Sequence, residues 1–240
     1  MSQERLDKTV ALALTLTRSE ARQLIKKGCV SVNGSVIKDG AFKTDAEKDE
    51  ITVNGKSASP EKYVYIMLNK PQGVVSASRD GKDKTVVDIL PDDMKRRGLF
   101  PAGRLDKDTT GFSLITDDGD FAHNILSPSH HVEKTYVAVL SSTVDEQLVC
   151  SRFSDGVTLA DGTVLLSARA RQLSGGENPV FEVVIKEGKY HQVKRMFASL
   201  GTSVSELKRI KIGGLSLDES LKPGEARYLT KEELLSVTQK

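Results

Sequence analysis

One stretch bounded by two glycines constrains this chain more than any other segment. Gly103 and Gly111 enclose the carboxylate of Asp106, and an apolar run over residues 112–115 follows directly. Glycine permits the backbone angles of a tight bend, so the pattern predicts a bend that leads into a strand. Such a bend holds one carboxylate at a fixed depth in a cleft. An ordinary surface turn with the same residue types is the alternative interpretation.

The bulk composition indicates a soluble globular protein. The chain has 240 residues, enough for a small domain followed by a larger one. Its first residues are polar, and no run approaches the roughly 20 apolar residues of a membrane helix. Cys29 and Cys150 are isolated, without metal-ligand or redox spacing. We therefore expect a cytoplasmic protein that makes no contact with a membrane.

The net charge of +2 is unevenly distributed along the chain. Residues 185–211 contain seven Lys and Arg but only two acidic residues. A local excess of this size favours attraction to phosphate groups, although solvated helix faces also collect lysines.

Residues 1–58 have the pattern of a small independent domain. Thr17 and Glu20 have capping-box spacing, and apolar residues then recur with helical periodicity until Gly28. Basic side chains recur every four residues beside that apolar face, at Arg18, Arg22 and Lys26. Short alternating segments with Asn-Gly turns follow and predict strands.

This segment resembles the S4 RNA-binding domain. The residues that carry the resemblance are Arg5, Leu6, Asp7, Lys8, Arg18, Ala21, Ile25, Gly28, Val30 and the Val-Asn-Gly at 32–34. A cationic helix pair of this type binds RNA by its shape and phosphate positions. We therefore expect Arg5, Arg18, Arg22 and Lys26 to bind RNA; a merely solvated helix face is the alternative.

Beyond a linker at 59–62, residues 63–240 are predicted to form a second, larger domain. Candidate strands, among them residues 135–140 and 180–185, and short helices, among them residues 191–200, occur without regular alternation. This order disfavours a doubly wound parallel sheet. The fold class predicted for the chain is α+β, with a small α+β domain followed by a mixed, mainly antiparallel sheet.

Four segments of this second domain recur together in one enzyme family. They are Lys70-Pro71-x-Gly73, the run 103–111 with its continuation to 119, Lys134-Thr135-Tyr136, and the run 187–196. In this order they resemble the pseudouridine synthases of the RsuA branch, whose reference member acts on small-subunit ribosomal RNA. A C-terminal run from Ile212 to Thr230 adds to the resemblance, which spans nearly the whole chain.

The resemblance implies isomerisation of a uridine in RNA. The N1–C1′ bond breaks, the uracil turns, and C5 bonds to C1′. Asp106 is implied as the nucleophile, Lys194 as the cation that keeps it ionised, and Tyr136 as the ring that stacks on the base. Arg104 is a second candidate for the cation, or for a group that fills the space of the flipped base.

Further residues near these motifs are expected to contact RNA, namely Lys70, Lys189, His191, Gln192 and Arg195. For His191 and Gln192 a structural role is the alternative. The turn that contains Lys70 is also expected to line the site. The implied reaction needs no cofactor and no metal, and the sequence contains no P-loop, dinucleotide fingerprint or metal-ligand cluster. The expected partner is ribosomal RNA or a ribosomal subunit assembly intermediate, and the expected state is a monomer.

Two alternatives to a small-subunit enzyme stay open. One is an enzyme of the same branch that modifies large-subunit RNA. The other is a non-catalytic RNA-binding assembly factor, which would not need Asp106, Tyr136 and Lys194 together.

Overall fold

The computed structural model describes residues 4–14, 16–45, 48–58, 63–127, 130 and 132–238. The chain divides into two compact units, Met1–Tyr63 and Val64–Lys240. The expected linker, 59–62, lies outside the described residues.

The first unit combines a helix pair with small sheets. Its elements are β1 (Glu4–Arg5), α1 (Leu6–Ala13), α2 (Arg18–Lys26), β2 (Val30–Val32), β3 (Ser35–Val36), β4 (Lys43–Thr44), β5 (Ile51–Val53) and β6 (Lys56–Ser57). One sheet has the strand order β3-β2-β5-β6, and β1 pairs with β4. The predicted capping box is present, since the Thr17 hydroxyl accepts from the Glu20 N–H while the Glu20 carboxylate accepts from the Thr17 N–H. Leu6, Ala21 and Ile25 lie in the apolar core of this unit.

The second unit is built on one long mixed sheet. Its strands are β7 (Tyr65–Lys70), β8 (Phe100–Pro101), β9 (Thr110–Thr116), β10 (Lys134–Leu140), β11 (Arg169–Ser174), β12 (Val180–Ile185), β13 (Val204–Ile212), β14 (Leu215–Ser216) and β15 (Ala226–Tyr228). The main order is β11-β12-β10-β13-β9-β7-β15. Among the described strands only β13 and β9 pair in parallel, through Lys208 with Thr110 and Arg209 with Gly111. The predicted α+β class is confirmed.

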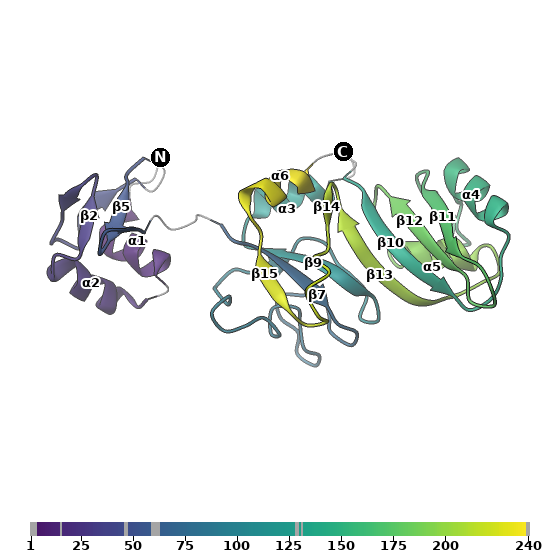
Figure 1. Ribbon diagram of the computed structural model, residues 1–240, viewed down its shortest axis with the longest axis horizontal. Coiled ribbons are helices and arrows are strands. Elements are labelled where there is room, and N and C mark those ends of the chain that lie inside the picture. The colour runs from purple at the N-terminus through teal and green to yellow at the C-terminus, as the bar shows by residue number, and fades with distance from the viewer. Residues whose placement is uncertain are drawn as a thin grey trace. The chain divides into compact units, whose positions relative to one another are not determined.

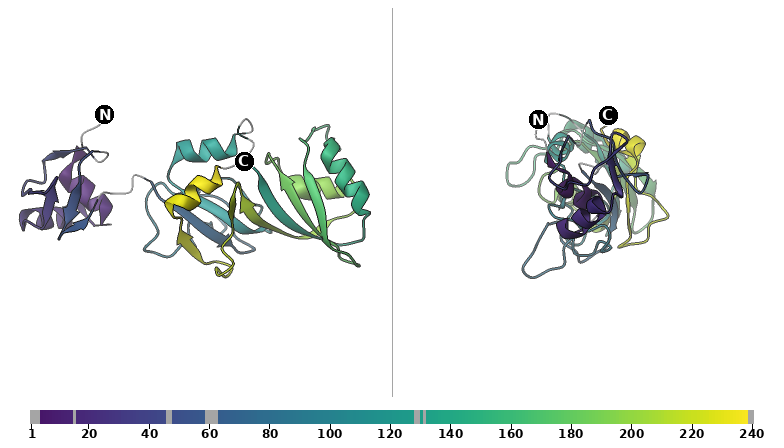
Figure 2. Two further views of the ribbon diagram at one scale, coloured as in Figure 1. Left: turned by 45° about the horizontal axis from the view of Figure 1, so that its top comes forward. Right: turned by 90° about the vertical axis from the view of Figure 1, so that its left-hand side faces the viewer.

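Four helices among the described residues of this unit cover the sheet: α3 (Gly119–Leu126), α4 (Glu146–Asp155), α5 (Gln192–Ala198) and α6 (Lys231–Val237). In both views that show the sheet, α3 and α6 accompany the β7–β9 half and α4 and α5 the β10–β12 half (Figures 1 and 2). The two halves have separate apolar cores, and the β7–β9 half contributes to a second cluster that includes Ile66, Leu68 and Ile115. The β9–β13 pair joins the two halves.

Helix α5 begins one residue later than the periodicity of residues 191–200 predicts. His191 has a left-handed backbone, with φ of 49°, and therefore caps the helix instead of belonging to it. The helix ends at Ala198, and Gly201, with φ of 82°, continues the turn into β13.

Glycine is needed at the two ends of the 103–111 run for different physical reasons. Gly103 has φ of 97° and sits in the bend, as expected. Gly111 has φ of 95°, and a Cβ placed there would lie 2.3 Å from the carbonyl oxygen of Arg209. Only glycine allows β13 to run this close to the start of β9.

Candidate active site and RNA-binding residues

Asp106 lies on the loop between β8 and β9, and its carboxylate has a cationic neighbour. The Lys194 Nζ atom, on α5, is 3.5 Å from Asp106 Oδ2, and the His191 Nε2 atom is 3.4 Å from Oδ1. The Asp106 side chain keeps 27% of its surface exposed, and that of Lys194 keeps 21%. The carboxylate is thus partly sheltered yet open to a ligand.

A second carboxylate competes for the same ammonium group. Asp108 Oδ1 lies 2.5 Å from Lys194 Nζ, and this hydrogen bond lowers the pKa of the Asp108 carboxyl below its usual value. The side chain of Asp108 is 61% exposed. Lys194 therefore lies between two anions, with the more exposed one bound at the shorter distance.

The loop that holds Asp106 is anchored by a buried lysine. The Lys70 Nζ atom donates to the carbonyl oxygens of Asp106 at 3.1 Å, Lys107 at 3.3 Å and Thr109 at 2.7 Å, and also to that of Pro71. Burial lowers the pKa of Lys70 to about 8, against the opposing effect of the nearby carboxylates of Asp108 and Asp106.

Ser76 fixes the same loop from its other side. Its hydroxyl donates to the carbonyl oxygen of Leu105 at 2.9 Å and accepts from the Leu105 N–H at 3.0 Å. The backbone on either side of Asp106 is therefore positioned before any ligand arrives.

Tyr136 lies in the wall beside this loop. It belongs to β10, is 8% exposed, and shares an apolar cluster with Leu105 and Val193, the neighbours of Asp106 and Lys194 in sequence. Within the described part of the chain, its hydroxyl has no hydrogen-bond partner. A polar group at the edge of an apolar wall is thus available for a ligand.

The arginine predicted beside Asp106 is not part of this cluster of charges. Arg104 is exposed and makes no hydrogen bond or ion pair with any residue that the structure describes. Of the two cations considered for contact with Asp106, the structure places only Lys194 there. Arg104 is left free to reach a ligand at the rim.

Two of the side chains predicted to bind RNA, Lys70 and Gln192, are buried. Lys70 is 0% exposed and is fully occupied by backbone carbonyl oxygens. Gln192 is 4% exposed; its side chain accepts from the Lys189 N–H and donates to the carboxylate of Glu187. Both side chains form hydrogen bonds that hold backbone groups in place. Nothing in their polarity alone distinguishes this role from contact with RNA.

The other predicted residues of this region reach solvent. Lys189 is exposed, and Arg195, 28% exposed, is paired with Asp161 at 2.5 Å. Tyr190, which sequence reasoning did not single out, is 75% exposed, and its ring stacks on that of His191 with centroids 3.8 Å apart. An exposed aromatic residue beside the basic motif was the signal that could have found it.

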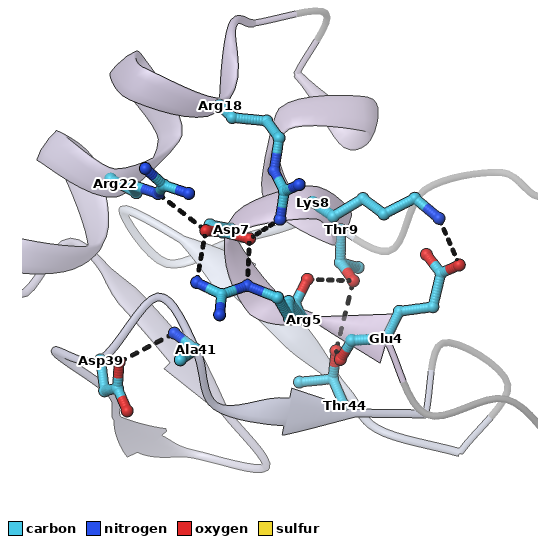
Figure 3. A network of polar contacts seen from close by, with 10 residues as sticks. All are labelled: Glu4, Arg5, Asp7, Lys8, Thr9, Arg18, Arg22, Asp39, Ala41 and Thr44. Atoms are coloured by element: carbon cyan, nitrogen blue, oxygen red, sulfur yellow. Dashed lines mark hydrogen bonds and ion pairs between the residues drawn. The ribbon is translucent and has the colours of Figure 1, made fainter.

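In the first unit, the predicted basic residues converge on one acid. Figure 3 shows the guanidinium groups of Arg5, Arg18 and Arg22 around the carboxylate of Asp7, which is completely buried. Lys26 is exposed, as expected for the end of the basic stripe.

Comparison with known proteins identifies both units. The model of the RNA pseudouridylate synthase family matches residues 64–199, and that of the S4 domain matches residues 4–51. This chain belongs to the RNA pseudouridylate synthase family. It is accordingly an enzyme that isomerises uridine to pseudouridine in RNA.

Relatives of this family match nearly the full length. A ribosomal small subunit pseudouridine synthase A of Vibrio vulnificus is 45% identical over 97% of this chain and 99% of its own. An uncharacterized RNA pseudouridine synthase of Bacillus subtilis is 43% identical over 96% of both chains. A crystal structure of a pseudouridylate synthase is 40% identical, covers 97% of this chain and 99% of its own, and has a TM-score of 0.68.

No group of three or more His, Cys, Asp or Glu side chains among the described residues is arranged to hold a metal ion. None of their helices combines the length and apolar character that crossing a membrane requires.

Proposed function

We propose that this pseudouridine synthase modifies a uridine of small-subunit ribosomal RNA. The observation that carries the proposal is the ion pair between Asp106 and Lys194, which positions one sheltered carboxylate with a cation at its side. The relatives named as ribosomal small subunit enzymes, at 42–45% identity over almost the full length, support the choice of RNA.

In this mechanism Asp106 is the nucleophile. Its carboxylate attacks the flipped nucleotide, at the ribose or at the uracil ring, and the N1–C1′ bond breaks. After the uracil has turned, C5 bonds to C1′ and the bond between Asp106 and the nucleotide breaks, which restores the carboxylate. The C5 proton leaves, and N1 takes up a proton. Lys194 stabilises the carboxylate through charge, and an anionic nucleophile in a water-excluding site gains most from such a neighbour.

Two further side chains receive roles in holding the base. Tyr136 stacks on the uracil, and its hydroxyl, unpartnered within the described residues, assists removal of the C5 proton. Arg104, exposed at the start of the same loop, contacts the phosphate of the flipped nucleotide or fills its place in the helix.

RNA is held by both units. Arg5, Arg18, Arg22 and Lys26 contact phosphates from the S4 domain, and Lys189, His191 and Arg195 do so near the site. Tyr190 offers its exposed face to an unpaired base beside the target. The protein acts as a cytoplasmic monomer on ribosomal RNA or on an assembly intermediate.

The test uses ribosomal RNA carrying tritium at C5 of uridine. Pseudouridine formation replaces the C5–H bond with a C5–C1′ bond, so tritium appears in water only when the reaction occurs. We expect release from small-subunit RNA and none from large-subunit RNA. Asp106→Asn should abolish release while binding the same RNA within about twofold, because Asn is nearly isosteric with Asp but lacks its charge. Release from large-subunit RNA alone contradicts the substrate, and release by Asp106→Asn contradicts the nucleophile.

A further inference from the structure

The carboxylate of Asp7 is the centre of the basic cluster in the S4 domain. Asp7 lies in the first turn of α1 with 0% of its surface exposed. Isolated buried charges are strongly unfavourable, so a fully buried carboxylate needs partners that satisfy it. Among the residues that the structure describes, all of its charged partners are arginines (Figure 3).

Both oxygens of Asp7 are used twice. Oδ1 accepts from Arg5 Nε at 3.2 Å and Arg18 Nη2 at 2.5 Å, and Oδ2 accepts from Arg5 Nη2 at 2.9 Å and Arg22 Nε at 2.8 Å. Arg5 precedes α1, whereas Arg18 and Arg22 are one turn apart on α2. One carboxylate thus gathers three guanidinium groups from two elements.

The arginines give up only part of their hydrogen-bonding capacity to Asp7. Each guanidinium has five N–H donors, and these three spend one or two each on the carboxylate. Their side chains remain 42%, 49% and 57% exposed. The hydrogen bonds from Arg5 are the first of the effects that hold the pKa of Asp7 far below its ordinary range, so its charge persists at any neutral pH.

We propose that Asp7 is a positioning residue that pre-assembles the three arginines into a phosphate-binding site for the RNA backbone. The proposal rests on the RNA substrate proposed above. Three guanidinium groups this close together repel one another, and the central carboxylate offsets that repulsion and fixes the direction of each planar fork. The cluster keeps a net charge of +2, which suits two phosphates of a folded RNA strand. Its side chains lose little freedom on binding, because they are already ordered.

This role makes a prediction that runs against simple charge counting. Asp7→Asn makes the cluster more positive by one charge. If the arginines contribute to RNA binding only through their positive charge, Asp7→Asn must bind RNA more tightly. If Asp7 positions them, binding must become weaker although the protein has become more basic.

Asp39 provides the matched control. It is an exposed acid near Arg5 whose carboxylate accepts from the Ala41 N–H and bonds to none of the three arginines. Asp39→Asn changes the charge of the domain by the same amount and leaves the cluster intact. We expect a transcript of small-subunit ribosomal RNA to bind Asp39→Asn as tightly as wild type or up to about threefold tighter, and to bind Asp7→Asn about tenfold more weakly.

Two readouts separate positioning from loss of structure. With the full-length chain, Asp7→Asn should raise KM for the transcript while changing kcat less than about twofold, because Asp106 lies in the other unit. In a chain that already carries Arg18→Ala and Arg22→Ala, adding Asp7→Asn should weaken binding no further. Tighter binding by Asp7→Asn, or an equal loss in both backgrounds, overturns the proposal.

A milder substitution keeps the proposal testable if Asp7→Asn does not fold. Arg22→Lys preserves the charge at an exposed position but gives up the planar fork held by Asp7; Lys27→Arg, at the end of the same helix and outside the cluster, is its control. We expect Arg22→Lys to weaken binding about threefold and Lys27→Arg to leave it unchanged. Equal affinities overturn the positioning role, whereas failure of the wild-type chain to bind the transcript overturns the proposed substrate instead.

Discussion

The buried ammonium group of Lys70 donates a hydrogen bond of 2.7 Å to the carbonyl oxygen of Thr109, at the end of the loop that carries Asp106. Three further carbonyl oxygens of this region point at the same nitrogen. A single side chain on β7 thereby fixes the path of the backbone around the proposed nucleophile. We expect its contribution to catalysis to be indirect, through the position of Asp106.

Replacing Lys70 with Met should lower turnover far more than RNA binding. The four carbonyl oxygens would lose a charged donor, which costs on the order of 1.5–3 kcal/mol per charge-assisted bond. We expect kcat to fall at least about 100-fold, because the loop is no longer held in one position. Binding of the RNA, measured by filter retention, should change less than about threefold. A normal kcat in a folded Lys70→Met protein would contradict this role.

The pKa of Lys70 predicts a loss of activity at alkaline pH without unfolding. Because burial lowers that pKa from 10.5 to about 8, the ammonium loses its proton as pH rises through 8, and the hold on the loop weakens. Between about pH 8 and 10.5 the unfolded chain binds more protons at this residue than the folded chain, so its contribution to the free energy of unfolding rises with pH. We expect kcat to decline above pH 8 while urea midpoints show no parallel loss from this group.

Lys134 is the control for that profile. It is another buried lysine whose pKa burial lowers to about 8, but its ammonium bonds the carbonyl oxygen of Ile125, away from the Asp106 loop. Lys134→Met should keep the alkaline decline of kcat. If the decline disappears in this variant, it belongs to Lys134 and not to Lys70.

We expect Lys194 to contribute through its charge, and Asp108 to influence which carboxylate the ammonium group of Lys194 faces. Lys194→Met removes the cation 3.5 Å from Asp106, and we expect kcat to fall about 100-fold, with partial recovery in Lys194→Arg.

Asp108→Asn removes the competing anion, and the ammonium group of Lys194 then turns fully to Asp106. Single-turnover rates should fall less than about fivefold in Asp108→Asn. A larger loss there would mean that Asp108 itself takes part in the reaction.

Tyr190 should contribute to substrate binding through its ring alone. Stacking of a base on an aromatic side chain is worth about 1–3 kcal/mol. Tyr190→Ala should therefore raise KM about tenfold, and Tyr190→Phe, which keeps the ring, should stay within about twofold of wild type. Steady-state kinetics with the tritiated RNA distinguish the two; equal KM values for Ala and Phe would show that the ring does not stack on RNA.

A comparison of Gly111 with Gly34 tests how strictly the close approach of β13 requires glycine at position 111. Both have a positive φ, but a Cβ at Gly34 meets nothing within 4 Å, whereas one at Gly111 meets the Arg209 carbonyl oxygen at 2.3 Å. Gly34→Ala should cost about 1–2 kcal/mol from the backbone angle alone. Gly111→Ala should cost more than about 3 kcal/mol, measured by urea unfolding, because strands must separate. Comparable losses would mean that the sheet adjusts freely there.

Much of the architecture followed from local patterns. The capping box at Thr17, the Asn-Gly turns and the strand over 180–185 depend on neighbours in sequence, and the structure confirms them. The start of α5 was displaced, because a left-handed His191 is a tertiary feature that helical periodicity does not encode.

The proximity of Asp106 and Lys194 was predicted, whereas the buried side chains that hold the surrounding backbone were not. Asp106 and Lys194 are 88 residues apart, and resemblance to a family paired them correctly. Periodicity and composition could not show that Lys70 and Gln192 are buried, because a lysine or a glutamine in a polar motif serves RNA or backbone equally well. The grouping of three arginines by Asp7 was likewise invisible, since it depends on how α1 meets α2.

The register of the parallel pairing between β9 and β13 determines how far apart the side chains of Asp106 and Lys194 lie. Asp106 precedes Thr110, the first residue of β9, by four residues. Lys194 precedes Val204, the first residue of β13, by ten residues. A slip of this ladder by two residues keeps every side chain on its face of the sheet, yet displaces the carboxylate of Asp106 from the ammonium group of Lys194 by about 7 Å. A chain that has slipped in this way would look folded by spectroscopy and still be inert, so the steric fit at Gly111 protects chemistry as much as stability.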